Sequence, residues 1–351
     1  MAITVLIPSL NPDEKLVRVV EDLLAAGVED VLLVDDGSDE AHQIPFATLS
    51  ALPQVTLLRH EVNRGKGRAL KTGFAHVLEH RPDCAGVVTV DGDGQHGTRD
   101  VCRLAEALEQ EPTVWLGCRD FNHPDVPPRS RFGNKASCLT MRLLCRVNVS
   151  DTQTGLRGIP RSLLPAMLEI EGERFEYETN MLLAFPQLSV VHKELTIETI
   201  YIDDNATSHF RPIRDGWRIY RLMLGYFLRF TASGLISAVV DVLLFTLFLS
   251  LFTTLGNPSP IVWATVVARV ISSLLNFALN YRVVFRSQRQ LGSSLWRYYL
   301  LCLCQMFVSA ELVALLSTLL PLWPTLIKCV VDVVLFLISF RIQQRFVFHK
   351  K

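Results

Sequence analysis

The chain has 351 residues, 49% of them hydrophobic, and a mean hydropathy of +0.27, which is high for a wholly soluble protein. Its net charge of zero hides an asymmetry, since residues 1–225 carry 24 Lys and Arg against 32 Asp and Glu, whereas residues 226–351 carry 11 against 3. The acidic half argues against a nucleic-acid partner, and the basic, apolar half suits the anionic surface of a lipid bilayer, so we expect two domains in two environments.

The first half alternates short apolar runs with helical patterns. In chain order these are strand 3–8, helix 13–26, strand 31–35, strand 55–58, helix 68–79, strand 87–91, helix 99–110 and strand 114–117. Such alternation predicts an α/β domain with a Rossmann-like, mostly parallel sheet that helices cover on both faces. In sheets of this kind ligands bind at the carboxyl ends of the strands. The polar residues at those ends are therefore the candidates for a site.

Acidic residues follow two of the predicted strands. Asp35 and Asp36 end the second one, and Asp91 and Asp93 form an Asp-x-Asp after the strand that begins at Val87. Carboxylates brought together at one sheet edge make an oxygen-rich site that suits Mg²⁺ or Mn²⁺.

Neither a calcium-binding loop nor a phosphate-binding loop matches the spacing of these segments. An EF-hand loop counted from Asp91 would need glycine where His96 stands and glutamate where Cys102 stands. The segment Asn63–Gly67 lacks the spacing of a phosphate-binding GxxxxGK[ST] loop.

The second half contains four apolar stretches that are long enough to cross a bilayer, which takes roughly 20 residues each. They lie at about residues 231–252, 260–279, 298–320 and 322–340. Before them, residues 211–228 place arginines on one helical face and apolar or aromatic residues on the other, which predicts an amphipathic helix on the membrane surface. We therefore expect domains at 1–210 and 229–351, joined by this interfacial segment.

Arginines cluster between the second and third spans and after the fourth, so the positive-inside rule places both segments, the first domain and both termini in the cytoplasm. The spans also repeat at an offset of 63 residues, because the segment 280–285 resembles 343–348. Two duplicated helical hairpins are expected. Lys328 and Asp332 stand four residues apart in the fourth span, where they serve either as a structural ion pair or in a lipid-headgroup or transport role.

These motifs together resemble a family 2 glycosyltransferase of the GT-A fold. The matching elements are Ile7-Pro8 with Asn11, Val34-Asp35-Asp36-Gly37-Ser38, Asn63-x-Gly65-Lys66-Gly67-x-Ala69 before Gly73, Asp91-x-Asp93-x-Gln95 and Gly117-Cys118-Arg119. The segment Asp151–Arg157 resembles that of polyprenol-phosphate sugar synthases such as dolichol-phosphate mannosyltransferase, and the four spans resemble a GtrA-like membrane domain. An isolated Asp-x-Asp is weak evidence, but the ordered set is specific.

The resemblance implies a nucleotide-sugar donor and a divalent metal ion, Mg²⁺ or Mn²⁺. Asp93, Asp91 and Gln95 would hold the metal against the departing diphosphate. The residues implied at the donor are Pro8, Asn11, Asp35, Asp36, Lys66, Asp91 and Glu178. Lys66 is otherwise a surface lysine, and Glu178 otherwise charges a helix N-terminus.

The resemblance also implies a polyprenyl phosphate acceptor, undecaprenyl or dolichyl. The residues that would bind its phosphate are Arg119, Arg129, Arg131 and Asn134, because arginine matches phosphate oxygens in pairs. Asp151 and Arg157, with Asp93, are the implied catalytic residues, Asp151 either orienting the acceptor or acting as a base.

The implied reaction is an inverting hexosyl transfer from a UDP- or GDP-linked sugar at the cytoplasmic membrane face, by a protein that could be a homo-oligomer. One alternative is a processive polysaccharide synthase, against which the absence of a Gln-x-x-Arg-Trp motif counts. Another is a lipid-carrier flippase or scaffold with a degenerate transferase domain, which the intact Asp91, Asp93 and Arg157 disfavour.

Overall fold

A computed structural model describes residues 3–124, 126–145, 147–198, 212–256, 258–285, 287, 289–319 and 323–348. The chain forms two compact units, Met1–Leu222 and Met223–Lys351. This division falls inside the predicted interfacial segment 211–228. The predicted domain boundary at residue 210 lies outside the described residues and stays a prediction.

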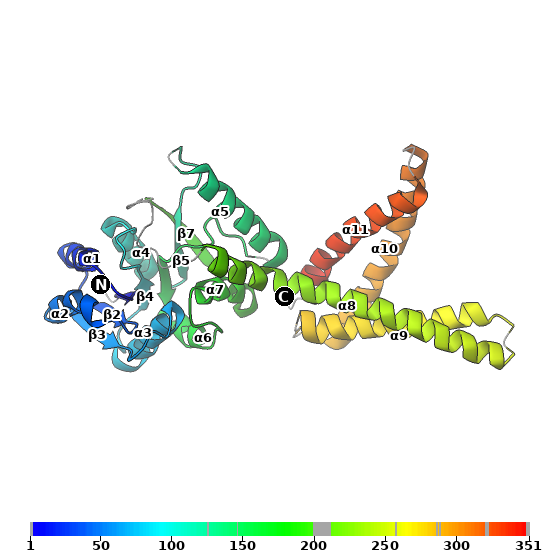
Figure 1. The fold of residues 1–351 in the computed structure, drawn as a ribbon, viewed down its shortest axis with the longest axis horizontal. Helices are drawn as coiled ribbons and strands as arrows, with labels where there is room; N and C mark the ends of the chain where they lie inside the picture. Colours follow the sequence, from blue (N-terminus) through cyan, green and yellow to red (C-terminus); the bar gives the residue numbers. More distant parts are fainter. Residues whose placement is uncertain are drawn as a thin grey trace. The chain divides into compact units, whose positions relative to one another are not determined.

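The first unit contains one seven-stranded sheet, ordered β3-β2-β1-β4-β6-β5-β7 (Figure 1). Its strands are β1 Ile3–Ser9, β2 Val31–Asp35, β3 Val55–Arg59, β4 Gly86–Thr89, β5 Val114–Arg119, β6 Arg157–Pro160 and β7 His192–Ile197. Only β6 runs antiparallel to its neighbours, β4 and β5. The predicted mostly parallel sheet is confirmed, and β6 and β7 are added to the five predicted strands.

Helices cover both faces of the sheet. One face packs on α1 Glu14–Ala25, α2 Ile44–Ser50 and α4 Thr98–Gln110, and its core includes Val5, Leu33, Leu16, Phe46 and Leu104, all buried. The other face packs on α3 Lys66–His80, with α6 Leu164–Leu168 and α7 Glu176–Leu188 against α3. Because side chains alternate along a strand, the odd residues of β1 face the first layer and Leu6 faces α3.

Helix α5, Pro128–Thr140, continues into a π-helical segment at Met141–Cys145. Asn134 Nδ2 fastens α5 to the chain after it by donating to the Ser150 carbonyl oxygen at 2.7 Å. The apolar side chains of Phe132 and Leu139 are 76% and 54% exposed. Helix α5 therefore exposes two large apolar side chains among polar and basic ones.

The second unit is helical. Its helices are α8 Pro212–Thr254, which begins before the unit boundary at Met223, α9 Pro260–Leu279, α10 Leu291–Leu319 and α11 Pro324–Ile342. Among the described residues, three helical segments are long and apolar enough to span a membrane: Phe227–Thr254, Pro260–Val284 and Leu291–Leu319. Helix α11 has 19 residues, and its spanning role stays a prediction. The interfacial segment is not a separate element, since α8 runs through it into the first span and no proline interrupts the helix after Pro212.

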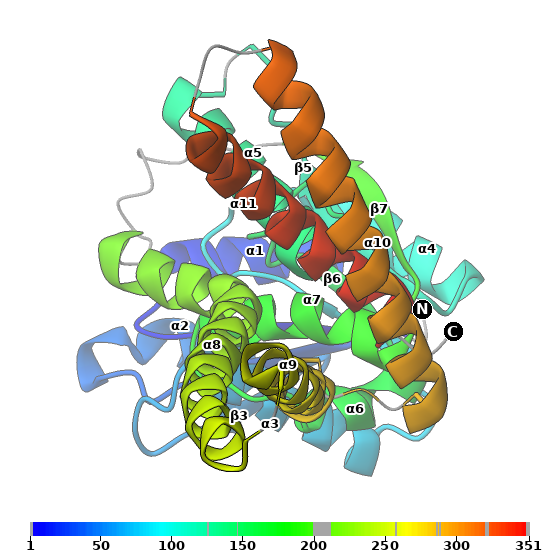
Figure 2. The same ribbon diagram turned by 90° about the vertical axis from the view of Figure 1, so that its right-hand side faces the viewer.

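Helices α8 and α9 lie side by side, as do α10 and α11, and the two hairpins diverge from one common end (Figures 1 and 2). The predicted repeat takes the same shape twice, in the π-helical segments Asn280–Val284 and Gln343–Val347 at that end. There Asn280 Nδ2 donates to Gln343 Oε1 at 3.2 Å, and the rings of Phe285 and Phe348 stack at 5.1 Å. Equivalent residues of the two hairpins thus contact each other.

Asn280 is fully buried and joins three helices. Besides its bond to Gln343, it accepts a hydrogen bond from Ser233 Oγ at 2.6 Å and donates to Asn276 Oδ1 at 2.9 Å. Because lipid offers the freed groups no replacement partners, the substitution Asn280→Leu is expected to destabilise the second unit by about 0.5–2 kcal/mol. The measurement is the thermal midpoint of the purified protein in detergent.

The double variant Asn280→Leu with Gln343→Leu serves as the control. It removes both amides together, so it should lose less than the sum of the two single variants. Strict additivity would contradict the contact between the two repeats.

Candidate active site

A lysine and two carboxylates meet above the sheet. Lys66 Nζ lies 2.6 Å from Asp91 Oδ1 and 3.0 Å from Glu178 Oε1, and all three side chains are largely buried. They come from the start of α3, from the loop after β4 and from the first turn of α7. The structure thus brings together three residues that the sequence assigned to the donor, and Lys66 is no surface lysine.

The charges of this cluster stabilise one another. Burial alone would lower the pKa of Lys66, but the charges of Asp91 and Glu178 outweigh it and raise that pKa. Burial likewise opposes ionisation of Asp91, yet the Lys66 ammonium and His96 hold the pKa of Asp91 well below its usual range. Burial and the neighbouring charge of Asp91 raise the pKa of Asp93. The pair Lys66–Asp91 is therefore ionised at neutral pH.

The position of Asp91 depends on a close backbone approach. Strand β4 ends at Thr89, two residues before Asp91, and Thr89 Oγ1 donates to the Gly155 carbonyl oxygen at 2.7 Å. A Cβ atom on Gly155 would stand 2.9 Å from Asp91 Cγ and closer still to Oδ2. Only glycine leaves room for this carboxylate, which explains the glycine of the segment Asp151–Arg157.

Arg157 lies beneath the cluster, on β6, and is 1% exposed. Its Nε donates to the Thr154 carbonyl oxygen at 3.0 Å, and its Nη1 donates to the Glu178 carbonyl oxygen at 2.7 Å. Its Nη2 is buried and has no hydrogen-bond partner within the described part of the chain. Arg157 therefore fixes the backbone of α7 beside Glu178 and keeps one donor unused.

Asp151 and Arg119 pair with each other. Arg119 Nε and Nη2 donate to the two oxygens of the Asp151 carboxylate at 2.7 and 3.2 Å, and that carboxylate is fully buried. The Gln153 backbone N–H also donates to Asp151, at 3.0 Å. In this structure Asp151 orients Arg119; its predicted role as a base stays a prediction.

Asp36 organises the loop that carries Lys66. Its carboxylate accepts from the backbone N–H groups of Gly65 at 2.7 Å and Arg64 at 3.0 Å, and from His60 Nδ1 at 2.7 Å. The same loop passes close to Gly37, where φ is +77°. Asp36 thus sets the start of α3, and so the position of Lys66.

Asn11, which follows β1 and Pro8, and Asp35, at the end of β2, both contact the loop after β2. Asp35 is fully buried and accepts from the Ser38 backbone N–H at 2.8 Å and from Arg59 Nε at 3.0 Å. Asn11 has a φ of +49°, and its Oδ1 accepts from the Asp39 backbone N–H at 3.0 Å. The predicted donor contacts of these residues stay predictions.

The loop after β4 carries the residues predicted to hold a metal ion. Asp93 Oδ1 accepts from the Gln95 backbone N–H at 3.0 Å, and His96 Nε2 lies 3.5 Å from Asp91 Oδ2. Among the described residues no three His, Cys, Asp or Glu side chains converge as a metal site. Yet His96 Nδ1 is buried without a hydrogen-bond partner in the described part of the chain, beside carboxylates of the type that Mg²⁺ and Mn²⁺ prefer. The residues fit such an ion, and His96 is one that the sequence did not indicate.

A second region lies at α5, which carries three residues predicted at the acceptor, Arg129, Arg131 and Asn134. Arg131 Nη2 donates to the His123 carbonyl oxygen at 2.9 Å. A cavity of about 640 Å³ lies beside this helix, and its lining does not include Arg129 or Arg131. Its charged and amide lining comprises Arg119, Lys135, Arg142, Asn134, Asn122 and Asn148, with the acids Asp120 and Glu194. The sequence motifs contain neither Lys135 nor Arg142. The only feature of the sequence that could have indicated these two residues is the basic character of α5 and its continuation.

The chain therefore joins a mostly parallel α/β sheet, with carboxylates at its carboxyl edge, to helices that are apolar enough to span a membrane. Residues 4–167 match the model of glycosyl transferase family 2, and residues 229–348 match that of the GtrA/DPMS transmembrane domain. The first unit thus carries a family 2 glycosyltransferase domain, and the second carries a GtrA/DPMS transmembrane domain. The predicted GT-A fold, the enzyme class and the membrane attachment are thereby confirmed.

Relatives and a solved structure agree with this assignment. The UDP-N-acetylglucosamine–dolichyl-phosphate N-acetylglucosaminyltransferase of Methanococcus voltae is 26% identical over 241 residues, 63% of this chain and 95% of that protein. The polyprenol monophosphomannose synthase of Mycolicibacterium smegmatis is 28% identical over 166 residues, 46% of this chain and 62% of that protein. Mannosyl-3-phosphoglycerate synthase from Rubrobacter xylanophilus, 13% identical, shares the fold with a TM-score of 0.50 over 65% of this chain and 74% of that one.

The close approach of Gly155 to Asp91 can be tested. In the variant Gly155→Ala the added methyl group displaces the Asp91 carboxylate, so sugar transfer should fall about 10- to 100-fold while the protein stays folded. Gly292→Ala is the matched control, since its Cβ would meet nothing within 4 Å. Transfer of radiolabelled sugar to lipid measures both, and equal activity of the two variants would show that Asp91 need not stay where it is.

Proposed function

We propose that this protein transfers one hexosyl unit from a nucleotide-sugar to polyprenyl phosphate, releasing the nucleoside diphosphate. The observation that carries the proposal is that one domain contains two regions. One is the Lys66–Asp91–Glu178 cluster at the sheet edge, and the other is helix α5, which carries basic residues and exposed apolar side chains. The first suits a charged donor and the second a phosphate on a lipid. The two named relatives act on dolichyl phosphate and make a polyprenol phosphomannose, which supports the same acceptor class.

The donor would lie over the carboxyl ends of β1, β2 and β4. Asp35, Asp36 and Asn11 stand at the first two strand ends, and Lys66 and Glu178 stand beside Asp91. A metal ion, when bound by Asp91, Asp93 and Gln95, would supply positive charge to the diphosphate. The unused Nη2 of Arg157 gives the same site a buried donor group.

The acceptor phosphate would approach from α5. Phosphate is already an anion at neutral pH, so the enzyme needs to position it and compensate its charge rather than deprotonate it. Arg119, Lys135 and Arg142 line the cavity beside α5, while Phe132 and Leu139 on the same helix are exposed and apolar. Helix α5 and the π-helical segment after it thus offer Lys135 and Arg142 for the headgroup and apolar side chains for the isoprenoid chain.

The reaction follows as a single displacement. A phosphate oxygen of the acceptor forms a bond to the anomeric carbon as the bond from that carbon to the diphosphate oxygen breaks. The electron pair leaves with the nucleoside diphosphate, and the configuration at the anomeric carbon inverts.

The catalytic unit and both termini are assigned to the cytoplasmic face of the cell membrane. Arg289 Nη1 and Arg297 Nη1 both donate to the Phe346 carbonyl oxygen, at 3.1 and 2.9 Å. The arginine-rich segment after the second span therefore lies beside the chain that follows α11. Both basic segments at one end of the helices support the topology expected from the positive-inside rule.

Metal dependence is the first test. Excess EDTA should abolish transfer, and added Mg²⁺ or Mn²⁺ should restore it. Asp93→Asn should lower kcat about 100-fold or more, because the developing charge of the leaving group loses its counter-charge. Asp83→Asn, at the opposite end of β4 and exposed, is the matched control. Full activity in EDTA would remove the metal from the proposal.

The acceptor assignment is tested with Arg142→Ala. A charge-assisted contact to phosphate contributes about 1.5–3 kcal/mol, so the KM for polyprenyl phosphate should rise about 10- to 100-fold. The KM for the nucleotide-sugar should stay unchanged. Arg142→Lys, which keeps the charge but loses the planar fork, should lie between wild type and alanine.

Arg18→Ala on α1 is the control, since Arg18 is 75% exposed and does not line the cavity beside α5. If Arg142→Ala instead raised the KM for the nucleotide-sugar, the cavity beside α5 would belong to the donor.

A further inference from the structure

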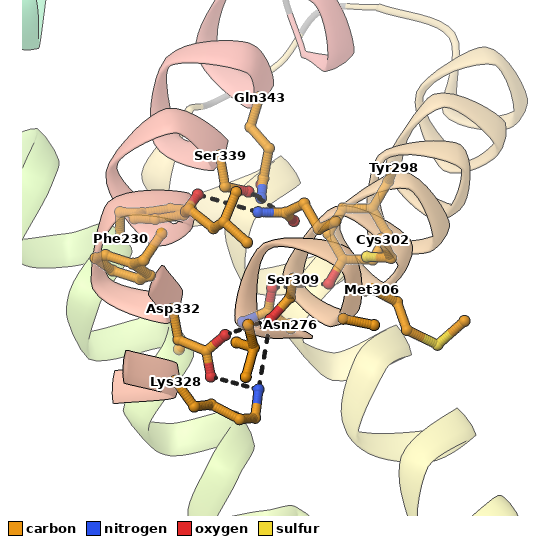
Figure 3. Close-up of a pocket in the computed structure, with 16 residues that line it drawn as sticks. Phe230, Asn276, Tyr298, Cys302, Met306, Ser309, Lys328, Asp332, Ser339 and Gln343 are labelled. Atoms are coloured by element: carbon orange, nitrogen blue, oxygen red, sulfur yellow. Dashed lines mark hydrogen bonds and ion pairs between the residues drawn. The ribbon is translucent and has the colours of Figure 1, made fainter. Parts of the chain in front are cut away.

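The second unit contains a cavity of about 720 Å³ between its helices, and both polar and apolar residues line it. Figure 3 shows that polar side chains from three helices point into it, among them Asn276, Tyr298, Ser309, Lys328, Asp332 and Gln343. Drug-sized ligands occupy cavities of about 300–1,000 Å³. Polar groups at membrane depth are costly and are a functional signal by default.

One end of the cavity is closed by a network of amides and hydroxyls that satisfy one another. Gln343 Nε2 donates to Ser339 Oγ at 3.0 Å, and Ser339 Oγ donates to Gln305 Oε1 at 3.1 Å. Tyr298 OH donates to Asn276 Oδ1 at 2.9 Å. These contacts connect the helices where the two repeats meet, and a structural role accounts for them.

The other end holds three polar groups with unused hydrogen-bonding capacity. Lys328 Nζ lies 2.9 Å from Asp332 Oδ2, and Ser309 Oγ donates to Asp332 Oδ1 at 2.8 Å. The side chains of Lys328 and Asp332 are 57% and 50% exposed, so both face open space. Asp332 stands about 12 Å along α11 from Pro324, at about 1.5 Å per residue, near the middle of that helix.

The other hairpin provides a comparison. There Arg269 Nη2 lies 3.3 Å from Asp241 Oδ2, and Ser272 Oγ donates to Asp241 Oδ1 at 2.6 Å. This group has the same composition of acid, cation and serine, but it does not line the cavity. An ion pair that only stabilised a hairpin would behave alike in both places.

The chemistry of the lining selects the ligand. Lys328 and Asp332 neutralise each other, and the other polar lining groups are amides and hydroxyls, so the cavity has no net charge to attract an isolated phosphate. A carboxylate, an ammonium group and amides instead match a ring of hydroxyl groups, which donate and accept in turn. Phe230 and Phe336, whose rings are 4.9 Å apart, give the cavity an apolar wall for the carbon face of such a ring.

We propose that this cavity is a second sugar-binding site, which takes the hexose ring of a lipid-anchored glycoside inside the membrane unit. Lys328, Asp332 and Ser309 contact the hydroxyl groups, and Phe230 with Phe336 packs against the ring. The site is separate from the Lys66–Asp91–Glu178 cluster and does not depend on the transfer reaction. Its ligand reaches it as a simple glycolipid or as a lipid-phosphate sugar, which share the hexose.

Photolabelling of the full chain in phosphatidylcholine nanodiscs tests the site. The probes are decyl glucoside, mannoside and N-acetylglucosaminide with a diazirine next to the sugar, the corresponding decyl-phosphate sugars, decyl phosphate and decanol. At least one hexose probe should label peptides of α10 and α11 around Ser309 and Asp332 at least fivefold more than decanol or decyl phosphate. Preference for the glycoside or for the phosphate sugar identifies the source of the hexose.

The double variant Lys328→Met with Asp332→Leu removes the polar pair without leaving a lone charge, and should reduce this labelling at least fivefold. The matched control is Arg269→Met with Asp241→Leu, which should leave it unchanged. Ser309→Ala is a milder variant for the case in which the double variant of Lys328 and Asp332 does not fold. It should also reduce the labelling.

Three outcomes would overturn the proposal. The first is equal labelling by decyl phosphate and the hexose probes. The second is an equal loss of labelling in the two double variants. The third is labelling that stays unchanged both in Ser309→Ala and in the double variant of Lys328 and Asp332. None of these outcomes bears on the transferase assays, because the readout is binding in the second unit.

Discussion

The catalytic domain is organised around one buried ammonium group between two carboxylates. Burying Lys66 costs free energy that only Asp91 and Glu178 offset, so the three side chains fix one another's positions. The three residues come from different elements. Asp91 lies in the loop after β4, Lys66 lies at the start of α3, and Glu178 lies in the first turn of α7. Gly155 leaves room for Asp91, and Arg157 holds the backbone of Glu178. The sheet supplies the edge, and this cluster determines what lies there.

A comparable constraint operates among the membrane helices, with amides in place of ions. Asn280 and Gln343, equivalent residues of the repeat, meet at the end from which the hairpins diverge. Because lipid provides no hydrogen bonds, a buried amide is satisfied only by another part of the protein. The repeat therefore packs against its own copy at one end. The divergence at the other leaves space, and Lys328 and Asp332 line it.

Two regions of the catalytic domain differ in the charge of their side chains. At the sheet edge, Asp91 and Glu178 surround Lys66; at α5, basic residues lie beside the exposed Phe132 and Leu139. Asp151 connects the two, since it orients Arg119, which lines the cavity beside α5, and begins the segment that ends at Arg157. One short segment thus positions groups in both regions.

The sequence by itself determined the fold class, the strands through β5, three of the four predicted apolar spans and the acids at the strand ends, because hydrophobic periodicity and turn residues are local signals. It did not reveal β6 and β7, since β6 has four residues and contains a buried arginine that no strand pattern predicts. Only the tertiary structure decided that Lys66 pairs with Asp91 and Glu178, that Asp151 holds Arg119, and that His96, Lys135 and Arg142 face candidate sites. These contacts join residues up to 112 positions apart, as Lys66 and Glu178 are, and sequence spacing carries no information about such distances.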